Sequence, residues 1–349
     1  MPTDIGQVIQ RNLEHFESTK NGLLLGCADK YPIDVLPTTF TAFTTSRSVY
    51  RKAQSSGRVT IGVLPEVAAK PDTVVLTMPK SKLELSFWLA WIRANVQPGA
   101  SLYLVGAKNE GIASGAKLLD EVSGKSVKID MARHCQLWHA VVTDPVQCFD
   151  LGDWETTYHY SMPSVGDITV CSLPGIFSYG GLDKGTAYLL DTLEPFFDDL
   201  VKRGKPIDGD WLDFACGAGG IAAYLLRRFP ELNLSCTDNS TIAIHCAKRT
   251  FEMNGLSARF ILSDGLFDVS GRYNGIVSNP PFHTGVKTDY SVTENFVADL
   301  SRHLKRKGRL LMVANRFLRY PEWIREAFPL YKKLASDNKF TVHLAQMSG

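Results

Sequence analysis

The second half of the chain repeats one pattern, a short apolar run followed by a turn and a helical stretch, and this repeat constrains the fold more than any other feature. From residue 206 onward it predicts five buried strands, at residues 211–215, 234–237, 259–262, 275–278 and 309–314. Helices are expected between them at residues 221–229, 240–254 and 292–307. Ser240 would cap one helix, and Gly255 and Gly308 would each end one. Strands and helices that alternate in this way build an α/β fold, a parallel sheet with helices on both faces.

The first half carries a weaker copy of the same order of elements. Residues 73–80, a helical stretch around residues 87–91 and residues 99–108 parallel residues 274–281, the helix after them and residues 308–316. Both halves read strand, proline turn, helix, glycine and strand, which indicates an internal duplication. We expect two tandem domains, residues 1–155 and 156–349, joined within residues 149–154.

The turn after the first strand of the second half is rich in small residues. Residues 213–220 read Asp-Phe-Ala-Cys-Gly-Ala-Gly-Gly, and small residues at a strand-to-helix turn let backbone amides approach a ligand. Gly217, Gly219 and Ala222 also satisfy the dinucleotide fingerprint G-x-G-x-x-[GA]. A nicotinamide oxidoreductase is therefore an alternative at this point, as is a tight turn without a ligand.

Acidic residues stand at the ends of three successive predicted strands, at Asp213, Asp238 and Asp264. Asp238 lies 21 residues after Gly217, where a carboxylate can accept both hydroxyl protons of a ribose. This spacing fits NAD and S-adenosylmethionine equally. Asp264 could accept the amino group of an adenine. Each aspartate alone could be a turn or helix cap, but the ordered set favours a nucleoside cofactor.

The segment that decides between these cofactors is Asn279-Pro280-Pro281-Phe282, which follows the fourth strand. Two successive prolines fix φ near about −65° and donate no hydrogen bond, so the turn is stiff and its carbonyls are free to accept. The Asn279 side-chain oxygen and the Pro280 carbonyl can hold both N–H bonds of an exocyclic amine, and Phe282 can stack on the ring. The nitrogen lone pair would then face an incoming methyl group. No strong general base is needed, because the proton leaves during or after the transfer.

Together these segments resemble the S-adenosylmethionine-dependent, Rossmann-like methyltransferases that act on exocyclic or amide nitrogens. Residues 173–186, 279–283 and 313–321 resemble, more specifically, the ribosomal RNA small-subunit methyltransferase C family, and the resemblance spans essentially the whole chain. It implies two tandem methyltransferase domains, each a seven-stranded mixed sheet flanked by helices, with a degenerate N-terminal copy. Members of the family methylate N2 of a guanosine in 16S rRNA and prefer the assembled 30S subunit as substrate.

The resemblance assigns roles to single residues. The cofactor, S-adenosylmethionine, would be bound by Asp213, Ala215, Gly217, Gly219, Asp238, Asp264 and Asn279. Catalysis would rest on Asn279, Pro280 and Phe282. Further contacts to the substrate would come from Pro281, Phe282, His283 and Arg316. Ala215 stands where the family motif usually has its first glycine, a substitution that is harmless only if the residue has a negative φ.

The duplicated first half serves as an internal control for these assignments. It has Met78-Pro79 where we align Asn279-Pro280, and only Gly26 in place of the clustered glycines. We therefore expect the first domain to bind neither the cofactor nor the target amine. RNA docking or support of the catalytic fold is its expected use.

Charge is divided unequally along the chain. Residues 1–200 hold 17 Lys and Arg against 22 Asp and Glu, whereas residues 201–349 hold 21 against 14. The basic second half permits a polyanionic partner. Residues 305–309 are the densest basic run and would form a solvated helix end. Arg316 is the better candidate for a phosphate contact, because it follows the carboxyl end of a strand, where the active sites of α/β proteins lie.

Several classes are excluded or disfavoured by composition. The start of the chain has no signal-peptide pattern, and no stretch reaches the roughly 18 apolar residues of a membrane span. The seven cysteines have no C-x-x-C pair, and the histidines show no metal-ligand spacing, so neither a disulfide framework nor a metal site is expected. We expect a cytoplasmic monomer.

Among the functions still open, a nitrogen methyltransferase accounts for the glycine turn, the acidic series, the Asn279 turn and the inactive copy together. A nicotinamide oxidoreductase leaves the Pro-Pro turn unexplained. A non-catalytic RNA-binding scaffold predicts loss of the pocket residues. The alternatives within the methyltransferases are the 23S rRNA guanine-N2 enzyme of the same architecture and the protein glutamine methyltransferases, whose motif usually ends in Tyr where Phe282 stands.

Overall fold

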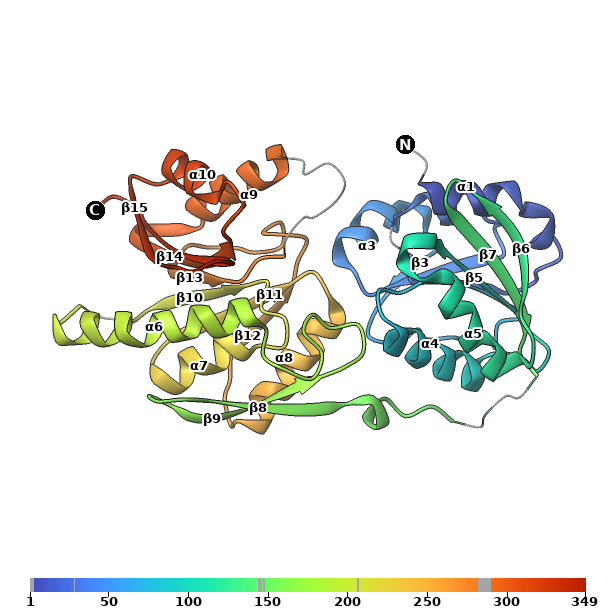
Figure 1. Cartoon of the computed structure of the whole chain (residues 1–349), viewed down its shortest axis with the longest axis horizontal. Coiled ribbons are helices and arrows are strands. Elements are labelled where there is room, and N and C mark those ends of the chain that lie inside the picture. The colour runs from blue at the N-terminus through green and yellow to red at the C-terminus, as the bar shows by residue number, and fades with distance from the viewer. Residues whose placement is uncertain (1–2, 28, 144–145, 147, 206, 282–289) are drawn as a thin grey trace. The chain divides into compact units, whose positions relative to one another are not determined.

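The computed structural model describes the chain except for residues 1–2, 28, 144–145, 147, 206 and 282–289 (Figure 1). It divides into two compact units. Unit 1 is Met1–Glu155 with Leu173–Gly175, and unit 2 is Thr156–Ser172 with Ile176–Gly349. No described helix is both long and apolar enough to cross a membrane.

Unit 1 is built on a seven-stranded sheet with the strand order β3-β2-β1-β4-β5-β7-β6. Only β7 runs antiparallel to its neighbours. The strands are β1 Gly22–Leu25, β2 Phe40–Thr44, β3 Val59–Ile61, β4 Thr73–Thr77, β5 Ser101–Ala107, β6 Val127–Ala132 and β7 Cys135–Val141. The helices are α1 Asp4–Arg11, α2 Tyr31–Val35, α3 Arg47–Ala53, α4 Lys82–Asn95 and α5 Ile112–Ser123.

Unit 2 repeats this topology, with the order β12-β11-β10-β13-β14-β16-β15 and only β16 antiparallel. The strands are β10 Asp210–Phe214, β11 Asn233–Asp238, β12 Arg259–Leu262, β13 Tyr273–Ser278, β14 Leu304–Asn315, β15 Leu330–Ser336 and β16 Phe340–Gln346. The helices are α6 Lys184–Lys202, α7 Gly220–Arg228, α8 Thr241–Met253, α9 Tyr290–Arg302 and α10 Tyr320–Ala327. A separate antiparallel hairpin is formed by β8 Thr156–Met162 and β9 Gly166–Ser172. The predicted fold of two mixed seven-stranded sheets flanked by helices is confirmed.

Helices cover both faces of each sheet, because successive side chains of a strand point to opposite sides (Figure 1). In unit 2, Leu212 and Ile276 pack with α9 and α10, whereas Trp211 and Val277 pack with α6, α7 and α8. Unit 1 is divided in the same way, with α4 and α5 on one face and α1, α2 and α3 on the other. The strands are apolar on both faces, as a doubly covered sheet requires.

Most of the elements expected in unit 2 lie within two residues of the predicted positions, and β12 matches the range 259–262. The Ser240 hydroxyl accepts a hydrogen bond from the backbone N–H of Ala243 at 3.3 Å, as an N-cap does. Gly255 follows α8 with φ of +65°. These local signals therefore predicted the α8 boundaries correctly.

The helix predicted at residues 292–307 is wrong at its C-terminal end. α9 ends at Arg302, and the basic run belongs to β14. Lys305 Nζ lies 2.6 Å from Asp210 Oδ2 and 3.0 Å from Asn274 Oδ1, so the run is held at the sheet rather than at a helix terminus. Gly308 does not stop a helix. A Cβ at Gly308 would lie 2.8 Å from the Lys305 carbonyl, so the close turn of this strand requires glycine.

Strand register corrects our alignment of the two copies by one residue. Leu25 pairs with Leu76 at the end of β1, and Phe214 pairs with Ser278 at the end of β10. The position of Asn279 in unit 1 is therefore held by Thr77, not by Met78. A shift of one residue moves every side chain to the other face of the sheet. If Met78 were aligned with Asn279, residues that pack on one face of the sheet in unit 2 would correspond to residues that pack on the opposite face in unit 1, so this alignment is excluded.

Candidate active site

A cavity lies at the carboxyl ends of the central strands of unit 2. It is lined by Tyr158, Phe177, Ser178, Leu182, Asp183, Thr186, Ala215, Cys216, Gly217, Ala218, Gly220, Ile221 and Asn279. The turn after β10 and the turn after β13 thus face one space, because β10 and β13 are neighbours in the sheet. This is the topological switch point at which open α/β sheets bind ligands.

The turn after β10 is held in a left-handed conformation at three residues, Ala215, Gly217 and Gly219, with φ of +57°, +52° and +80°. Gly219 also lies close to α8, since a Cβ there would be 3.1 Å from the Ala247 Cβ. Glycine is favoured at such positions, because a side chain there is strained or lacks space, and Ala215 is the exception. Residues 215–218 of the turn line the cavity, where the composition of the turn predicts a ligand.

Ala215 is strained in this conformation, because an L-residue with a side chain disfavours positive φ. Unit 1 has Gly26 with φ of +72° at the matching place after β1. We expect Ala215→Gly to raise the free energy of unfolding by about 1 kcal/mol, measured by chemical denaturation. Ala298→Gly in the interior of α9 is the control, and it should lower the free energy by a similar amount. A destabilised Ala215→Gly variant would contradict the assignment of strain.

Asp238 connects the end of β11 to the glycine turn. Its Oδ2 accepts a hydrogen bond from the Gly217 N–H at 3.0 Å, and its Oδ1 accepts one from the Ser240 N–H at 2.9 Å. Burial raises the pKa of this carboxyl, and the backbone N–H groups of Ser240 and Gly217 oppose the rise. Asp238 is not among the residues that line the cavity, although Gly217, to which it is bonded, is one of them, so its contact with ribose hydroxyls stays a prediction.

Asp213 lies beneath the turn rather than on the cavity wall. It is fully buried, and its Oδ2 accepts a hydrogen bond from the Ala222 N–H in α7 at 3.1 Å. Its Oδ1 has no hydrogen-bond partner among the described residues. Burial raises the pKa of Asp213 well above 3.8, and the charge of Asp238 adds to the rise. The side chain thus fixes the start of α7 through the bond to Ala222.

This raised pKa predicts how stability changes with pH. The folded state binds the Asp213 proton more tightly than the unfolded state, so the stabilisation is complete below pH 3.8 and is lost as the pH rises through the higher folded value. Asp213→Asn carries no charge at any pH. We expect its melting temperature to exceed that of the wild type by more at pH 8 than at pH 5, because the wild type loses stability between these pH values and the variant does not. A gap that is independent of pH would contradict this.

Asn279 follows β13, and its carboxamide is fixed by the start of α6. The Nδ2 group donates to Asp183 Oδ2 at 2.8 Å and to Thr186 Oγ1 at 2.9 Å. Asp183 is itself the N-cap of α6, accepting from the Thr186 N–H at 3.0 Å. The Asn279 Oδ1 atom is buried and has no hydrogen-bond partner among the described residues. Because both amide protons have acceptors, the free oxygen is a defined acceptor beside the cavity.

The sequence did not predict the contribution of α6 and β8 to this site. Gly185 lets α6 approach the Asn279 turn, since a Cβ there would lie 3.0 Å from Asp183 Oδ2 and 3.5 Å from Asn279 Nδ2. Tyr158 lines the cavity from β8, and burial, with the charge of Asp183 added, raises its pKa to about 12. Residues 183–186 belong to the segment 173–186 that resembles the family, but their contact with Asn279 could not be derived from the sequence.

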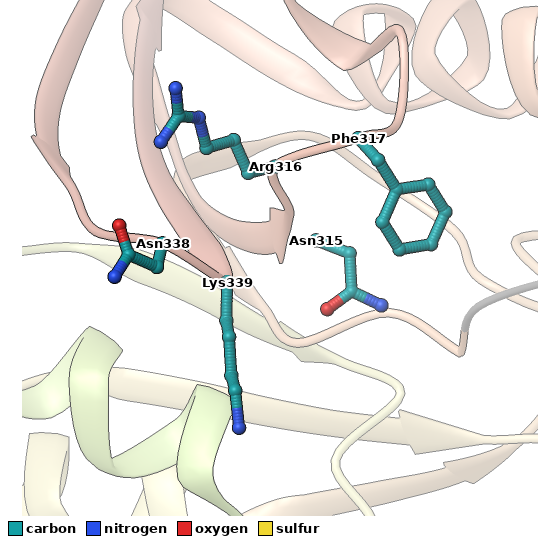
Figure 2. Close-up of a pocket in the computed structure, with 5 residues that line it drawn as sticks. All are labelled: Asn315, Arg316, Phe317, Asn338 and Lys339. Atoms are coloured by element: carbon teal, nitrogen blue, oxygen red, sulfur yellow. The ribbon is translucent and has the colours of Figure 1, made fainter.

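The remaining predicted residues are distributed as follows. Pro280 is buried and Pro281 is exposed, whereas Phe282 and His283 lie outside the described residues. Asp264 follows β12, and the adjacent Ser263 N–H donates to the Asp238 carbonyl at 2.9 Å. Asp264 is not among the residues that line the cavity. Arg316 lies in a separate groove at the end of β14 (Figure 2).

The same register identifies what unit 1 has at the four polar positions of unit 2. Leu24, Thr44, Val63 and Thr77 replace Asp213, Asp238, Asp264 and Asn279, respectively. The backbone turn is retained, since Thr44 Oγ1 accepts from the Ser46 N–H at 3.1 Å as Asp238 Oδ1 does from Ser240. Unit 1 thus keeps the fold and lacks every one of the predicted ligand-binding carboxyl and carboxamide groups.

Comparison with known proteins gives the family. The Methyltransferase small domain family matches residues 167–344, and the Methyltransferase small domain N-terminal family matches residues 6–158. A protein of Psychromonas ingrahamii named Ribosomal RNA small subunit methyltransferase C is 37% identical over 96% of this chain and 95% of its own length. One of the same name from Photobacterium profundum is 34% identical over 99% of both chains. The chain belongs to the ribosomal RNA small subunit methyltransferase C family.

A solved structure shares the fold of almost the whole of this methyltransferase C family chain. It is a T. thermophilus 16S rRNA methyltransferase of N2 of guanine 1207, determined in complex with AdoMet and guanosine. The TM-score is 0.84 at 23% identity, covering 99% of this chain and 92% of that one. The predicted family and the duplicated architecture are both confirmed.

Proposed function

We propose that this protein transfers a methyl group from S-adenosylmethionine to the exocyclic N2 amine of a guanosine in 16S rRNA, with the small ribosomal subunit as substrate. It would act as a monomer in the cytoplasm. The observation that carries this proposal is the buried Oδ1 of Asn279, which has no partner in the described part of the chain and is fixed beside the glycine turn by Asp183 and Thr186. The names of the relatives and the AdoMet and guanosine bound to the T. thermophilus enzyme support the substrate and the cofactor.

The residues present fit the cofactor. We assign the ribose hydroxyls to the Asp238 carboxylate, the methionine part to the Gly217 turn, and the adenine to Asp264, as the family resemblance implies. Gly217 lines the cavity, and its N–H donates to Asp238 Oδ2, which supports the first two assignments. Asp213 would support the turn through α7. The bound cofactor supplies an electrophilic methyl group on a sulfonium centre. Bringing this group in line with the target nitrogen is the main task of the protein, since the transfer needs little acid–base assistance.

The carboxamide of Asn279 positions the target amine. Its Oδ1 accepts one N–H of the guanine amine, and the Pro280 carbonyl accepts the other, so that the nitrogen lone pair points away from the turn. Asp183 and Thr186 hold the Asn279 Nδ2 group and so prevent the amide from turning over. A reversed amide would place its NH2 group, a donor, against the N–H donors of the guanine amine. Phe282 would stack on the base, and Pro281 and His283 would complete the pocket, as the family resemblance implies.

The alternatives account for less of the site. A nicotinamide oxidoreductase would use the glycine turn and Asp238, but it gives no role to the fixed Asn279 carboxamide. Methylation of 23S rRNA by the same chemistry remains the nearest competitor. For the domains at residues 1–155 and 156–349, we propose RNA docking or fold support by the first and catalysis by the second. The absence from unit 1 of the three carboxyl groups and the carboxamide supports this division.

The test is transfer of tritiated methyl groups to isolated small subunits, large subunits and naked 16S rRNA, followed by nucleoside analysis. We expect N2-methylguanosine, formed fastest on the small subunit. Labelled large subunits together with unlabelled small subunits would favour the 23S alternative. Binding of NADH without binding of the sulfonium compound would refute the proposal.

A further inference from the structure

A second hollow, which we call the β14 groove, opens at the carboxyl end of β14. Its lining residues come from the end of β14 and from the turn between β15 and β16, and they are Asn315, Arg316, Phe317, Asn338 and Lys339 (Figure 2). Its volume is about 430 Å³, within the range of sites that hold a small molecule or one nucleotide. The groove is distinct from the cavity beside the glycine turn, since the two share no lining residue.

The backbone of the groove is fixed by hydrogen bonds. The Arg316 N–H donates to the Lys339 carbonyl at 2.7 Å, joining the two sides. Asp337 Oδ1 accepts from the N–H groups of Lys339 and Phe340 at 2.7 and 2.6 Å, and these bonds lower the Asp337 pKa. The carboxylate is thereby engaged by the turn. The backbone that carries the side chains of the groove is thus fixed by its own hydrogen bonds.

The groove combines an exposed aromatic ring with two cations. Phe317 is 72% exposed, unusually open for a phenylalanine. The Arg316 guanidinium donates to the Asp337 backbone carbonyl at 3.3 Å, and the charges of Arg316 and Lys339 both act on the Asp337 carboxylate. Within the part of the chain that the structure describes, neither cation has a carboxylate partner at ion-pair distance. Figure 2 shows the Phe317 ring and the Asn315 amide on one side of the chain and the Arg316 guanidinium on the other. Exposed aromatics with flanking cations are the usual means of binding an unpaired nucleotide.

The β14 groove lies next to the Asn279 turn. β13 and β14 are neighbours, and Asn315 at the end of β14 pairs with Phe340. Phe340 in turn reaches Gly185, since a Cβ there would lie 3.3 Å from Phe340 Cε1 and 3.5 Å from Asn279 Nδ2. Phe340, the strand partner of Asn315, therefore also approaches the start of α6 that fixes Asn279.

Unit 1 gives an internal comparison. Strand pairing places Ala107 at the position of Asn315, and the Lys108 N–H donates to the His134 carbonyl at 2.8 Å as Arg316 does to Lys339. The residue after Lys108 is Asn109, so the unit that lacks the cofactor groups also lacks the aromatic ring. The ring accompanies the complete site and is not needed for the fold of the turn.

We propose that the β14 groove binds the nucleotide adjacent to the target guanosine, with its base stacked on Phe317 and its phosphates contacted by Arg316 and Lys339. This inference rests on the proposed function, because it assumes that an RNA strand enters at Asn279. It assigns substrate selection at this site to a neighbouring base as well as to the guanine. A protein segment of the ribosome is the alternative occupant that the experiment must exclude.

The test uses the full chain and labelled heptaribonucleotides with a single central guanine, in which the base on the 5′ or on the 3′ side is left out. By fluorescence anisotropy, one of the two abasic probes should bind the wild type about tenfold more weakly than the intact probe does. Phe317→Ala should bind the intact probe about tenfold more weakly and should not distinguish it from that abasic probe. Arg316→Ala and Lys339→Ala should each reduce the slope of log Kd against log salt by about 0.7.

Two exposed residues of β15, Leu330 and Lys332, provide matched controls, and their alanine variants should bind every probe as the wild type does. On small subunits, Phe317→Ala should raise KM about tenfold with kcat unchanged. The inference would be overturned if Phe317→Ala and the wild type had equal KM values on small subunits. It would also be overturned if the abasic probe weakened binding to Phe317→Ala as much as it weakens binding to the wild type. Failure of the wild type to methylate any RNA would instead refute the proposed function, and the abasic comparison would still test the groove.

Discussion

Asn279→Ala is expected to lower kcat for methyl transfer at least about 100-fold while changing the Kd for S-adenosylmethionine less than threefold. The Asn279 Oδ1 atom is a buried acceptor without a partner among the residues that the structure describes, and removing it releases the target amine from its orientation. A misplacement of about 1 Å costs on the order of 100-fold in rate. The measurements are single-turnover kinetics on small subunits and calorimetry of cofactor binding. Equal losses in both would contradict the division of roles between Asn279 and the glycine turn.

The start of α6 provides a matched pair of variants for the same prediction. Asp183→Ser keeps an N-cap for α6. The serine side chain is too short to replace the Asp183 Oδ2 atom, which accepts from Asn279 Nδ2 at 2.8 Å. We expect about a tenfold lower kcat and an unchanged melting temperature. Asp183→Asn retains an oxygen at the same reach and should recover most of the rate. If Asp183→Ser lost stability and rate together, a positioning role for Asp183 would not be supported.

The parts of the site that could be predicted from the sequence are those whose signal is local. The glycine turn, Asp238 and the Asn279 turn each follow a strand that is recognisable from its apolar residues, and parallel strands bring these ends to one edge. Asp183 is 96 residues from Asn279 in the chain, and no periodicity could connect them. Its N-cap position was readable, but the second function of its carboxylate depends on the packing of α6.

The two errors in the fold have a common cause, which is that tertiary pairing outweighs local propensity. Residues 303–307 continue a helical pattern, yet Lys305 finds Asp210 and Asn274 on neighbouring strands and joins the sheet. Likewise, the proline of Met78-Pro79 suggested an alignment with Asn279-Pro280. Only the strand pairing, which assigns Thr77 to that position, determines which face of the sheet a side chain occupies.

At Ala215 the sequence showed that the sign of φ matters, but it could not determine that sign. The departure from glycine mattered only if φ were positive, and φ is +57°. The backbone conformation is imposed by the turn, which the Cys216 N–H anchors to the Thr237 carbonyl at 2.9 Å. The strain therefore coincides with the cofactor cavity, as strained residues often do at functional sites.

Asp238→Thr is the variant for which unit 1 supplies the design. Thr44 at the matching position keeps the turn, because its hydroxyl accepts from the Ser46 N–H just as Asp238 accepts from Ser240. The substitution should therefore preserve the local fold while removing the carboxylate that would accept the ribose hydroxyls. Two charge-assisted hydrogen bonds are worth about 1.5 kcal/mol or more each, so we expect the Kd for S-adenosylmethionine to rise about 100-fold.

Calorimetry on the wild type should give one cofactor per chain, since unit 1 has Leu24, Thr44 and Val63 where unit 2 has three aspartates. At saturating cofactor the kcat of Asp238→Thr should recover to within a few-fold of the wild type, because Asn279 and its supports are untouched. This is the reverse of the Asn279→Ala pattern. A variant that bound the cofactor normally, or one whose kcat stayed low at saturation, would show that Asp238 acts on the turn rather than on the ribose.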